Sequence, residues 1–277
     1  RLEDTRMSGK VLHPVSEILL LTLCGVIAGS DGWEDIENYG VSKLDLLREL
    51  LPFNHGIPSD DTLRRFFRAI DPAVFQEVFI AFVSELLPEA RGRLIAIDGK
   101  TLRRSHDGAV KALHLVSAFA TEARLVLAQV PTEEKSNEIT AIPELLKLLD
   151  LQGATVSIDA MGCQRAIAEA IVEGGGHYLL GLKGNQGTLH DDVRLFFDEP
   201  PSDNIFITHE ETDKGHGRVE IRRCEATNDI AWLQENHHWP HLQSIVRITA
   251  TRVIGEKTST EVRHYITDDN PDPKRIL

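Results

Sequence analysis

The sequence predicts an α/β protein in which a helical region comes first, a mixed sheet follows and a β-rich segment comes last. Residues 14–87 carry apolar residues at three- and four-residue spacing between Gly, Pro, Ser and Asp breaks, a pattern typical of helices. From residue 93 onward, short apolar runs of strand type alternate with helical segments. After residue 200 the runs are again of strand type, rich in Thr, Val and Ile. These changes predict three parts, with bounds at 1–90, 91–199 and 200–277.

The N-terminal part is predicted to be a short helical bundle. Its apolar-periodic segments read PVSEILLLTLCGVIAG, GWEDIENYG, SKLDLLRELL, PSDDTLRRFFRAI and PAVFQEVFIAFVSELL. Ser59 stands before Asp60 and Asp61, where a hydroxyl can cap the first N–H groups of a helix and acidic side chains favour the positive end of its dipole. That helix also carries three arginines opposite its apolar side, which either contact DNA or form a solvated basic face.

The central part is predicted to form a mixed sheet. Three strands come first, RLIAID, LHLVSAFA and RLVLAQVP, joined by short turns. A helix, a strand, a helix, a strand and a helix follow, in the order EITAIPELLKLLD, ATVSID, QRAIAEAIVEGG, HYLLGLK and NQGTLHDDVRLFF. This order indicates an antiparallel hairpin edge joined to parallel crossover strands. In the last part we expect two hairpins, one turning between Gly215 and Gly217 and one near Gly255.

The segment GRLIAIDGKTLRRS, residues 92–105, ends its apolar run in Gly-Lys-Thr, as a phosphate-binding loop does. Such a loop needs a glycine five positions before the Gly of that triplet, because a glycine-rich turn must wrap backbone N–H groups around the phosphates. Leu94 occupies that position, within a run typical of a buried strand. A nucleotide-binding loop is therefore not expected. The feature that remains is Asp98, an aspartate at the end of a strand.

The composition indicates an ordinary globular protein with no membrane segment. Of its 277 residues, 42% are hydrophobic, which is enough for a sizeable core. The longest apolar stretch, residues 18–29, is shorter than the roughly 20 residues that cross a bilayer, so we expect a buried helix. Three cysteines without paired spacing favour a reducing cytoplasm. The net charge of -13 excludes a protein that coats nucleic acid over its whole surface, so any DNA contact must be local.

Two aspartates form the candidate chemical site. LIAIDGK places Asp98, and SIDAMGCQ places Asp159, directly after an apolar strand. In open α/β sheets, ligands bind outside the carboxyl ends of the strands, and two carboxylates there repel each other unless a cation lies between them. Oxygen ligands of this kind suit Mg²⁺ or Mn²⁺, and a pair of such ions can activate the attacking oxygen and stabilise the leaving oxygen of a phosphoryl transfer. Taken singly, each aspartate is also consistent with an ordinary loop residue.

Several segments resemble a known family. IAIDGKTLRRS, KSNEITAIPELLKLLDLQG, SIDAMGCQ and YLLGLKGNQ are similar to the ISAs1 family of bacterial insertion-sequence transposases, which includes the H-repeat-associated proteins, and IPSDDTLRRFFRAID is similar to its N-terminal associated region. The resemblance implies a ribonuclease-H-like core of the DDE type, which uses three acids and two Mg²⁺ ions to cut DNA and join it to target DNA. Asp98 then corresponds to the first acid and Asp159 to the second. The implied partner is double-stranded DNA at element ends and target, bound by a cytoplasmic homo-oligomer.

The third acid of that family is a glutamate on a later helix, in a segment with no counterpart before Leu277. We therefore expect a fragment that lacks this glutamate. Glu138 is near the place where ribonuclease-H-like nucleases carry an acid on the helix after the third strand, which makes it a candidate third metal ligand. The preferred explanation of Glu138 is a glutamate favoured at a helix start by the dipole.

Polar and basic residues follow two of the predicted strands. The predicted DNA contacts are Lys100, Arg103, Arg104, Lys183, Asn185 and Gln186. The first three follow Asp98 closely and are expected to bind phosphates beside the metal site, the alternative being a solvated basic turn. The last three follow HYLLGL on the same rim of the sheet.

The sequence thus predicts a DDE-type transposase that requires Mg²⁺ or Mn²⁺, with Asp98 and Asp159 as catalytic metal ligands. Two alternatives stay open. An inactive remnant would bind DNA or a partner protein through its helical N-terminal part. A ribonuclease-H-like nuclease would hydrolyse DNA without joining it, with Glu138 as its third acid.

Overall fold

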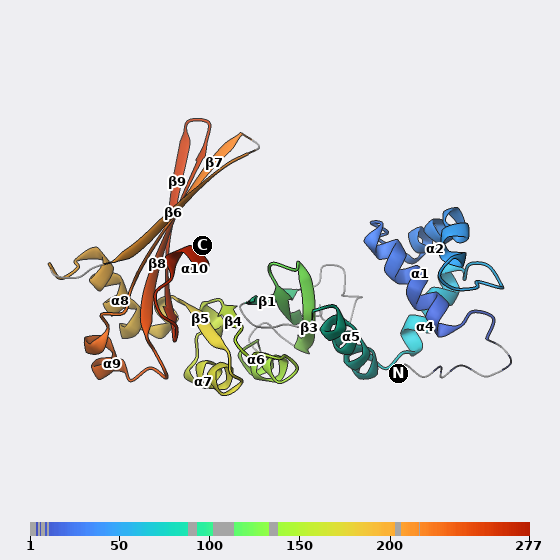
Figure 1. The fold of residues 1–277 in the computed structure, drawn as a ribbon, viewed down its shortest axis with the longest axis horizontal. Coiled ribbons are helices and arrows are strands. Elements are labelled where there is room, and N and C mark those ends of the chain that lie inside the picture. Colours follow the sequence, from blue (N-terminus) through green and yellow to red (C-terminus); the bar gives the residue numbers. More distant parts are fainter. Residues whose placement is uncertain are drawn as a thin grey trace, which may run out of the picture. The chain divides into compact units, whose positions relative to one another are not determined.

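The computed structural model describes residues 11–87, 93–101, 114–132, 138–202, 206–215 and 217–277, together with residues 4, 6 and 9. The chain forms two units, Arg1–Phe82 and Val83–Leu277. The first is built of helices and the second around a large sheet (Figure 1). None of the helices in the described ranges is long and apolar enough to cross a membrane.

The helical unit confirms the predicted N-terminal bundle. Its helices are α1 Val15–Ile27, α2 Trp33–Ser42, α3 Leu44–Arg48, α4 Asp60–Ala69 and α5 Pro72–Leu86, the last of which continues into the second unit. The core consists of side chains no more than 5% exposed: Ile18, Leu21, Ile36, Leu47, Phe53, Leu63 and Phe66. Ser59 caps α4 by accepting a hydrogen bond from the N–H of Thr62 at 3.4 Å. Helix α1 contains the apolar stretch that was expected to be a buried helix, and this expectation holds for one side only: Ile18 and Leu21 are fully buried. On the other side Leu23, Val26 and Ile27 are 45–76% exposed.

The described residues of the second unit form a nine-stranded sheet with the order β3-β2-β1-β4-β5-β9-β8-β7-β6. Its strands are β1 Leu94–Thr101, β2 His114–Ala120, β3 Leu125–Thr132, β4 Thr155–Ile158, β5 His177–Leu182, β6 Ile207–Gly215, β7 Arg218–Thr227, β8 Ser244–Ile254 and β9 Lys257–Thr267. Strands β1, β2 and β3 are antiparallel, whereas β4 and β5 run parallel to β1. This is the predicted combination of an antiparallel hairpin edge and parallel crossovers, in agreement with the ribonuclease-H-like mixed sheet that the family resemblance implies.

The two faces of the sheet are covered differently. Helices α6 Glu138–Leu146, α7 Arg165–Glu173 and α8 Thr188–Asp198 follow β3, β4 and β5 and pack on one face, over buried residues such as Ile97 and Ile158. Asp98 follows Ile97 on β1, and successive side chains of a strand point to opposite faces, so Asp98 points to the other face of the sheet. We call this the Asp98 face. The short helix α10 Pro273–Ile276 packs on the Asp98 face, over Ala226 and Val246.

The C-terminal strands extend this sheet. The predicted hairpins are β6–β7 and β8–β9, and they turn at the expected glycines; α9 Ala231–His237 lies between β7 and β8 and was not predicted. Strand β9 pairs with β5 only through residues 264–267, so its remaining residues run past the carboxyl end of β5 together with β8. Figure 1 shows these hairpins projecting from the sheet. The division of this unit at residue 199 stays a prediction.

Candidate functional site

Asp98 and Asp159 come together at the carboxyl ends of two neighbouring parallel strands. Strands β1 and β4 pair with Ile97 beside Ile158, and each aspartate is the next residue. Both isoleucines are buried and both aspartates are exposed, so both carboxylates are directed to the Asp98 face. Neighbouring strands lie about 4.8 Å apart. Two carboxylates at this rim can therefore share one divalent ion.

The chain turns sharply after Asp159. A 3-10 helix spans Ala160–Gly162, and Asp159 caps it, since its Oδ1 accepts a hydrogen bond from the N–H of Met161 at 3.0 Å. The carbonyl of Asp159 accepts a second bond, from the N–H of Gly162 at 3.0 Å. The orientation of this carboxylate is therefore coupled to the conformation of the turn that follows it.

The residues after β5 hold this turn from the neighbouring strand. Nδ2 of Asn185 donates to the carbonyl of Ala160 at 2.6 Å, and Nε2 of Gln186 donates to the carbonyl of Cys163. Both amides belong to the short helix Gly184–Gln186. Their predicted contact with DNA stays a prediction, and their bonds to the segment after Asp159 were not foreseen.

Glu138 lies close to Asp98 along β1 but on the other face. It is the first residue of α6 and is only 8% exposed. Its carboxyl group packs against the Cα of Gly99, so closely that a side chain at that position would collide with it. Because Gly99 and Asp98 are successive residues of a strand, they face opposite ways. The structure therefore brings the two aspartates together and places Glu138 across the strand from them.

Two of the predicted DNA contacts are exposed at the rim. Lys100 is two residues beyond Asp98 on β1 and points to the Asp98 face, and Lys183 directly follows β5. Both ammonium groups can approach a phosphate near the aspartates. Arg103 and Arg104 lie outside the described residues.

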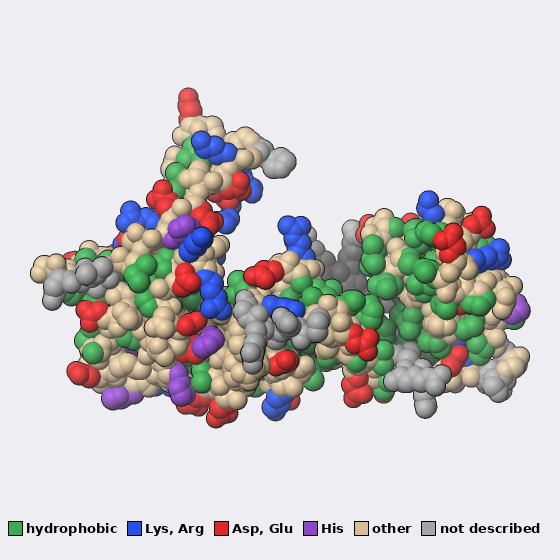
Figure 2. All heavy atoms as spheres, viewed as in Figure 1, with side chains coloured by type: hydrophobic (Ala, Val, Ile, Leu, Met, Phe, Trp, Pro, Cys, Tyr) green, Lys and Arg blue, Asp and Glu red, His purple; other side chains and the backbone are tan. Residues whose placement is uncertain are grey.

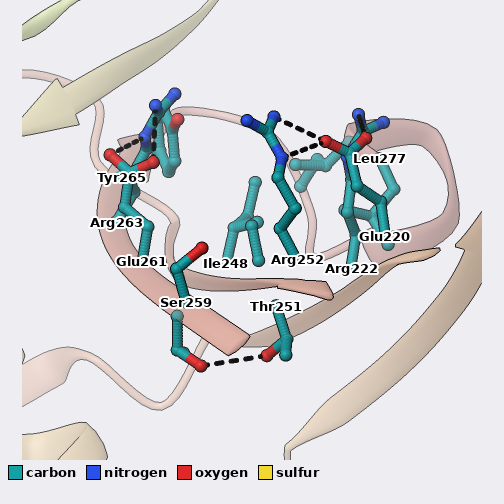
Figure 3. Close-up of a pocket in the computed structure, with 13 residues that line it drawn as sticks. Glu220, Arg222, Ile248, Thr251, Arg252, Ser259, Glu261, Arg263, Tyr265 and Leu277 are labelled. Atoms are coloured by element: carbon teal, nitrogen blue, oxygen red, sulfur yellow. Dashed lines mark hydrogen bonds and ion pairs between the residues drawn. The ribbon is translucent and has the colours of Figure 1, made fainter. Parts of the chain in front are cut away.

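An arginine-lined groove continues the Asp98 face beyond β4 and β5. Strand pairing shows that the face is continuous from Asp159 to β9. A Cβ on Gly181 of β5 would lie 3.6 Å from the carbonyl carbon of Asp159, so Gly181 is next to this residue. Gly181 in turn pairs with Tyr265 of β9. From Tyr265, alternate residues of β9, β8 and β7 point the same way. They line a groove of about 550 Å³, whose charged residues are Glu220, Arg222, Arg252, Glu261 and Arg263. We call these five residues the arginine groove (Figure 3).

Ion pairs hold the guanidinium groups of the arginine groove in place. Arg252 pairs with Glu220 at 2.6 Å, Arg222 with the same carboxylate at 3.2 Å, and Arg263 with Glu261 at 2.9 Å. Figure 3 shows the first and last of these pairs on opposite sides of the groove. The Arg252 guanidinium holds the pKa of Glu220 below its usual value, and Arg263 does the same for Glu261. All three arginine side chains remain 49–57% exposed, so each can still reach a ligand.

Mixed charge covers the projecting hairpins, as Figure 2 shows. The arginine groove is not predictable from the sequence alone, because Arg252 and Arg263 become neighbours of Arg222 only through the pairing of β7, β8 and β9. A weak signal was available. Glu220 precedes Arg222 by two residues, and Glu261 precedes Arg263 by two, a spacing that puts both charges on one face of a strand.

The aspartate pair fits Mg²⁺ or Mn²⁺ by the chemistry of its donors. Among the described residues, no three His, Cys, Asp or Glu side chains gather as a ligand cluster for a metal ion. Mg²⁺ usually keeps several waters and takes one or two carboxylates plus the phosphate oxygens of its substrate. Asp98 and Asp159 match that smaller ligand set.

Comparison with known proteins identifies the family. The sequence matches the family described as "Transposase DDE domain" over residues 89–266, which is more than half of the chain. The chain belongs to the DDE transposase family. Residues 1–83 match the "DDE_Tnp_1-associated" family, so the helical unit is the associated region of a DDE transposase. The resemblance to insertion-sequence transposases is confirmed.

Two of the curated relatives of this DDE transposase cover nearly the whole chain, and a third covers a short part of it. The H repeat-associated putative transposase YhhI of Escherichia coli is 41% identical over 96% of this chain and 72% of its own length. An uncharacterized protein in the dhlA 3' region of Xanthobacter autotrophicus is 43% identical over 98% of this chain and 92% of its own. A shorter E. coli relative, the inactive transposase YbfQ, is 52% identical over 22% of this chain.

Among solved structures, a piggyBac transposase in a synaptic complex with hairpin DNA aligns with 98% of this chain. The sequence identity is 9% and the TM-score is 0.39. The chain spans 55% of the length of that protein.

Proposed function

We propose that this chain cuts DNA strands and transfers them to a target, with Asp98 and Asp159 as its metal ligands. The observation that carries the proposal is the parallel pairing of Ile97 with Ile158. Because Asp98 and Asp159 are the next residues, they lie at the same edge of the sheet and on the same face. Membership of the DDE transposase family supports double-stranded DNA at element ends and target as the substrate. Mg²⁺ or Mn²⁺ is the cofactor, with two ions in the active complex on DNA.

The chain's own residues supply charge and position for this reaction. When bound, the divalent ions polarise the phosphoryl oxygen and make an attacking oxygen more nucleophilic. Asp98 lies on strand β1, which pairs with β2 and β4, and Oδ1 of Asp159 accepts a hydrogen bond from the turn that follows it, so the backbone that carries the two carboxylates is held in place. Lys100 and Lys183 provide cations beside them, which bind phosphates and hold the strand for in-line attack.

Glu138 is the remaining candidate for a third metal ligand. Its carboxyl group touches Gly99, the residue after Asp98, which supports the candidacy. Its low exposure and its position on the helix-covered face weigh against it, because a ligand must reach the ions on the Asp98 face. We therefore propose that Asp98 and Asp159 are the essential metal ligands. In the test below, the effect of substituting Glu138 distinguishes a nuclease from a transposase.

A strand-cleavage assay tests the proposed function. The whole chain is incubated with supercoiled plasmid and a labelled linear DNA in Mg²⁺, Mn²⁺ or EDTA, and nicked and joined products are separated on gels. We expect nicking and joining that require the metal and disappear in Asp98→Asn and Asp159→Asn. Nicking without joining that is lost in Glu138→Gln would favour a nuclease. Bound but uncut plasmid would contradict the proposal and favour an inactive remnant, the state that one relative's name describes.

We also propose that DNA phosphates are bound along the Asp98 face, from Lys100 and Lys183 at the rim into the arginine groove. The supporting observations are the continuity of this face through Gly181 and Tyr265 and the exposed guanidinium groups beyond them. The chain carries a net charge of -13, so a local row of cations is what its binding to DNA requires. Arg103 and Arg104 stay predicted contacts from the segment after Lys100.

Removing arginines from the groove is expected to weaken DNA binding in a salt-dependent way. The double variant Arg252→Ala, Arg263→Ala should lower affinity for random-sequence duplex, and it should reduce the slope of log K against log salt by about 1.8, because each lost phosphate contact accounts for about 0.9. Fluorescence anisotropy at several salt concentrations measures both quantities. Arg194→Ala is the matched control, since Arg194 is an exposed arginine of helix α8, on the opposite face. An unchanged slope in the double variant would exclude the groove as a phosphate site.

A further inference from the structure

The turn after Asp159 is held at both ends by side chains from a different strand. Asn185 donates to the carbonyl of Ala160, the first residue of the turn, at 2.6 Å. Gln186 donates to the carbonyl of Cys163, the residue that ends the turn. The two donors therefore lie on either side of Met161, whose N–H group donates to the Asp159 carboxylate.

These two hydrogen bonds satisfy the carbonyl groups of two buried residues. Ala160 is 5% exposed and Cys163 is fully buried, so a carbonyl there that loses its donor is poorly placed to find water instead. The donors themselves are on the outside: Asn185 is exposed and Gln186 half-buried, and they add little apolar contact. Their loss should consequently loosen the turn without removing any part of the hydrophobic core.

We propose that Asn185 and Gln186 are positioning residues, which fix the Asp159 carboxylate in the orientation that binds the metal. The inference rests on the proposed function, because it takes Asp159 as a metal ligand. It assigns the two side-chain amides to the turn and leaves DNA contact at this rim to Lys100 and Lys183. In metal sites, residues that orient a ligand in this way typically change the affinity for the metal about 10- to 100-fold when removed.

The test uses isosteric substitutions that turn the donor into an acceptor. Asn185→Asp and Gln186→Glu keep the size of the side chain but replace its NH₂ group by an oxygen, which repels the carbonyl it faces. Asn185→Gln and Gln186→Asn retain a neutral NH₂ donor and serve as the conservative variants. Asn236→Asp, at an exposed position of α9, adds the same charge elsewhere and is the matched control.

Two readouts separate a local from a global effect. The first is the alkylation rate of each cysteine in metal-free protein, followed by mass spectrometry of the peptides. Cys163 is buried beneath the turn, and Cys224 is equally buried in the β-rich part, so Cys224 reports general unfolding. The second readout is the Mn²⁺ affinity, measured by calorimetry.

We expect Asn185→Asp and Gln186→Glu to raise the alkylation rate of Cys163 at least about tenfold, leave that of Cys224 unchanged, and weaken Mn²⁺ binding at least about tenfold. Donor-retaining variants should recover part of both effects. Equal acceleration at both cysteines, or a loosened turn with unchanged Mn²⁺ affinity, would overturn the inference. So would unchanged values of both readouts with lowered DNA affinity, which would make the amides DNA contacts. Failure of the unsubstituted chain to bind Mn²⁺ would overturn the proposed function itself, and the inference with it.

Discussion

Replacing Asp98 or Asp159 with asparagine is expected to weaken Mn²⁺ binding at least about 100-fold, the upper end of what is lost when only a supporting residue of a metal site is removed. Asparagine has the shape of aspartate but lacks its charge, and the site has two carboxylates at one rim, so either change halves its negative charge. Both side chains are exposed, and the fold should therefore survive. Calorimetric titration of each variant measures the affinity, and circular dichroism checks the fold.

The control for this prediction is Asp213→Asn. Asp213 is an exposed residue of β6, so its substitution changes the net charge equally and leaves the rim intact. A similar drop in Mn²⁺ affinity in the control would mean that the affinity depends on the net charge of the protein and not on the two aspartates. Unchanged affinity in both rim variants would place the metal, and with it the chemistry, somewhere else on the protein.

The second large effect is expected at Leu180, in the middle of β5. Strand β5 is the only link in the sheet order between β4 and β9 among the described strands, and Leu180 is fully buried. Truncation of such a side chain to alanine typically lowers the free energy of unfolding by about 2–5 kcal/mol. We expect Leu180→Ala to do so for the whole unit Val83–Leu277, with amide protection lost together in β4 and in β8. Hydrogen exchange measured by mass spectrometry follows both strands.

Leu21→Ala provides the matched comparison in the other unit. Leu21 is also fully buried, in the core of the helical bundle, so its truncation should lower protection there and leave the sheet unaffected. If Leu180→Ala removed protection from β4 while β7 and β8 kept theirs, the β-rich hairpins would be independently stable. That result would support the sequence-based division at residue 199 and contradict a sheet that unfolds as one.

Local sequence signals were sufficient for the order of the elements other than α9, and for the expectation that the two aspartates lie on neighbouring strands. Helical spacing and strand runs identify these elements because each depends on residues close together in the chain. The juxtaposition of Asp98 and Asp159 followed from a general rule for parallel strands, whose carboxyl ends meet at one edge of a sheet. The register of Ile97 beside Ile158 agrees with it.

Features that depend on long-range pairing were not predictable. Nothing in the segment after residue 200 indicates that β9 adds to β5, because an exposed sheet edge can accept a strand from anywhere in the chain. The arginine groove exists only once this pairing and those of β7 and β8 are known. Asn185 and Gln186 illustrate the same limit, since an amide after a strand has the same appearance in sequence whether it faces DNA or a neighbouring carbonyl.

Glu138 shows how one residue can satisfy two expectations. It lies at the start of a helix, where the dipole favours an acidic side chain, and it also lies against β1 next to Asp98. Glu138 packs against Gly99, and successive residues of a strand face opposite ways, so Glu138 lies on the face opposite to that of Asp98. The sequence alone does not show which residue of β1 Glu138 contacts. For this reason we propose Asp98 and Asp159 as the essential metal ligands and keep Glu138 only as a candidate third ligand.

Anomalous diffraction from crystals of the chain soaked in Mn²⁺ would show whether the two aspartates hold an ion between them. We expect a manganese peak at the carboxyl ends of β1 and β4, about 2 Å from a carboxylate oxygen of Asp98 and of Asp159. A peak that contacts neither aspartate, or carboxylates that point to opposite faces of the sheet with no ion between them, would contradict the account.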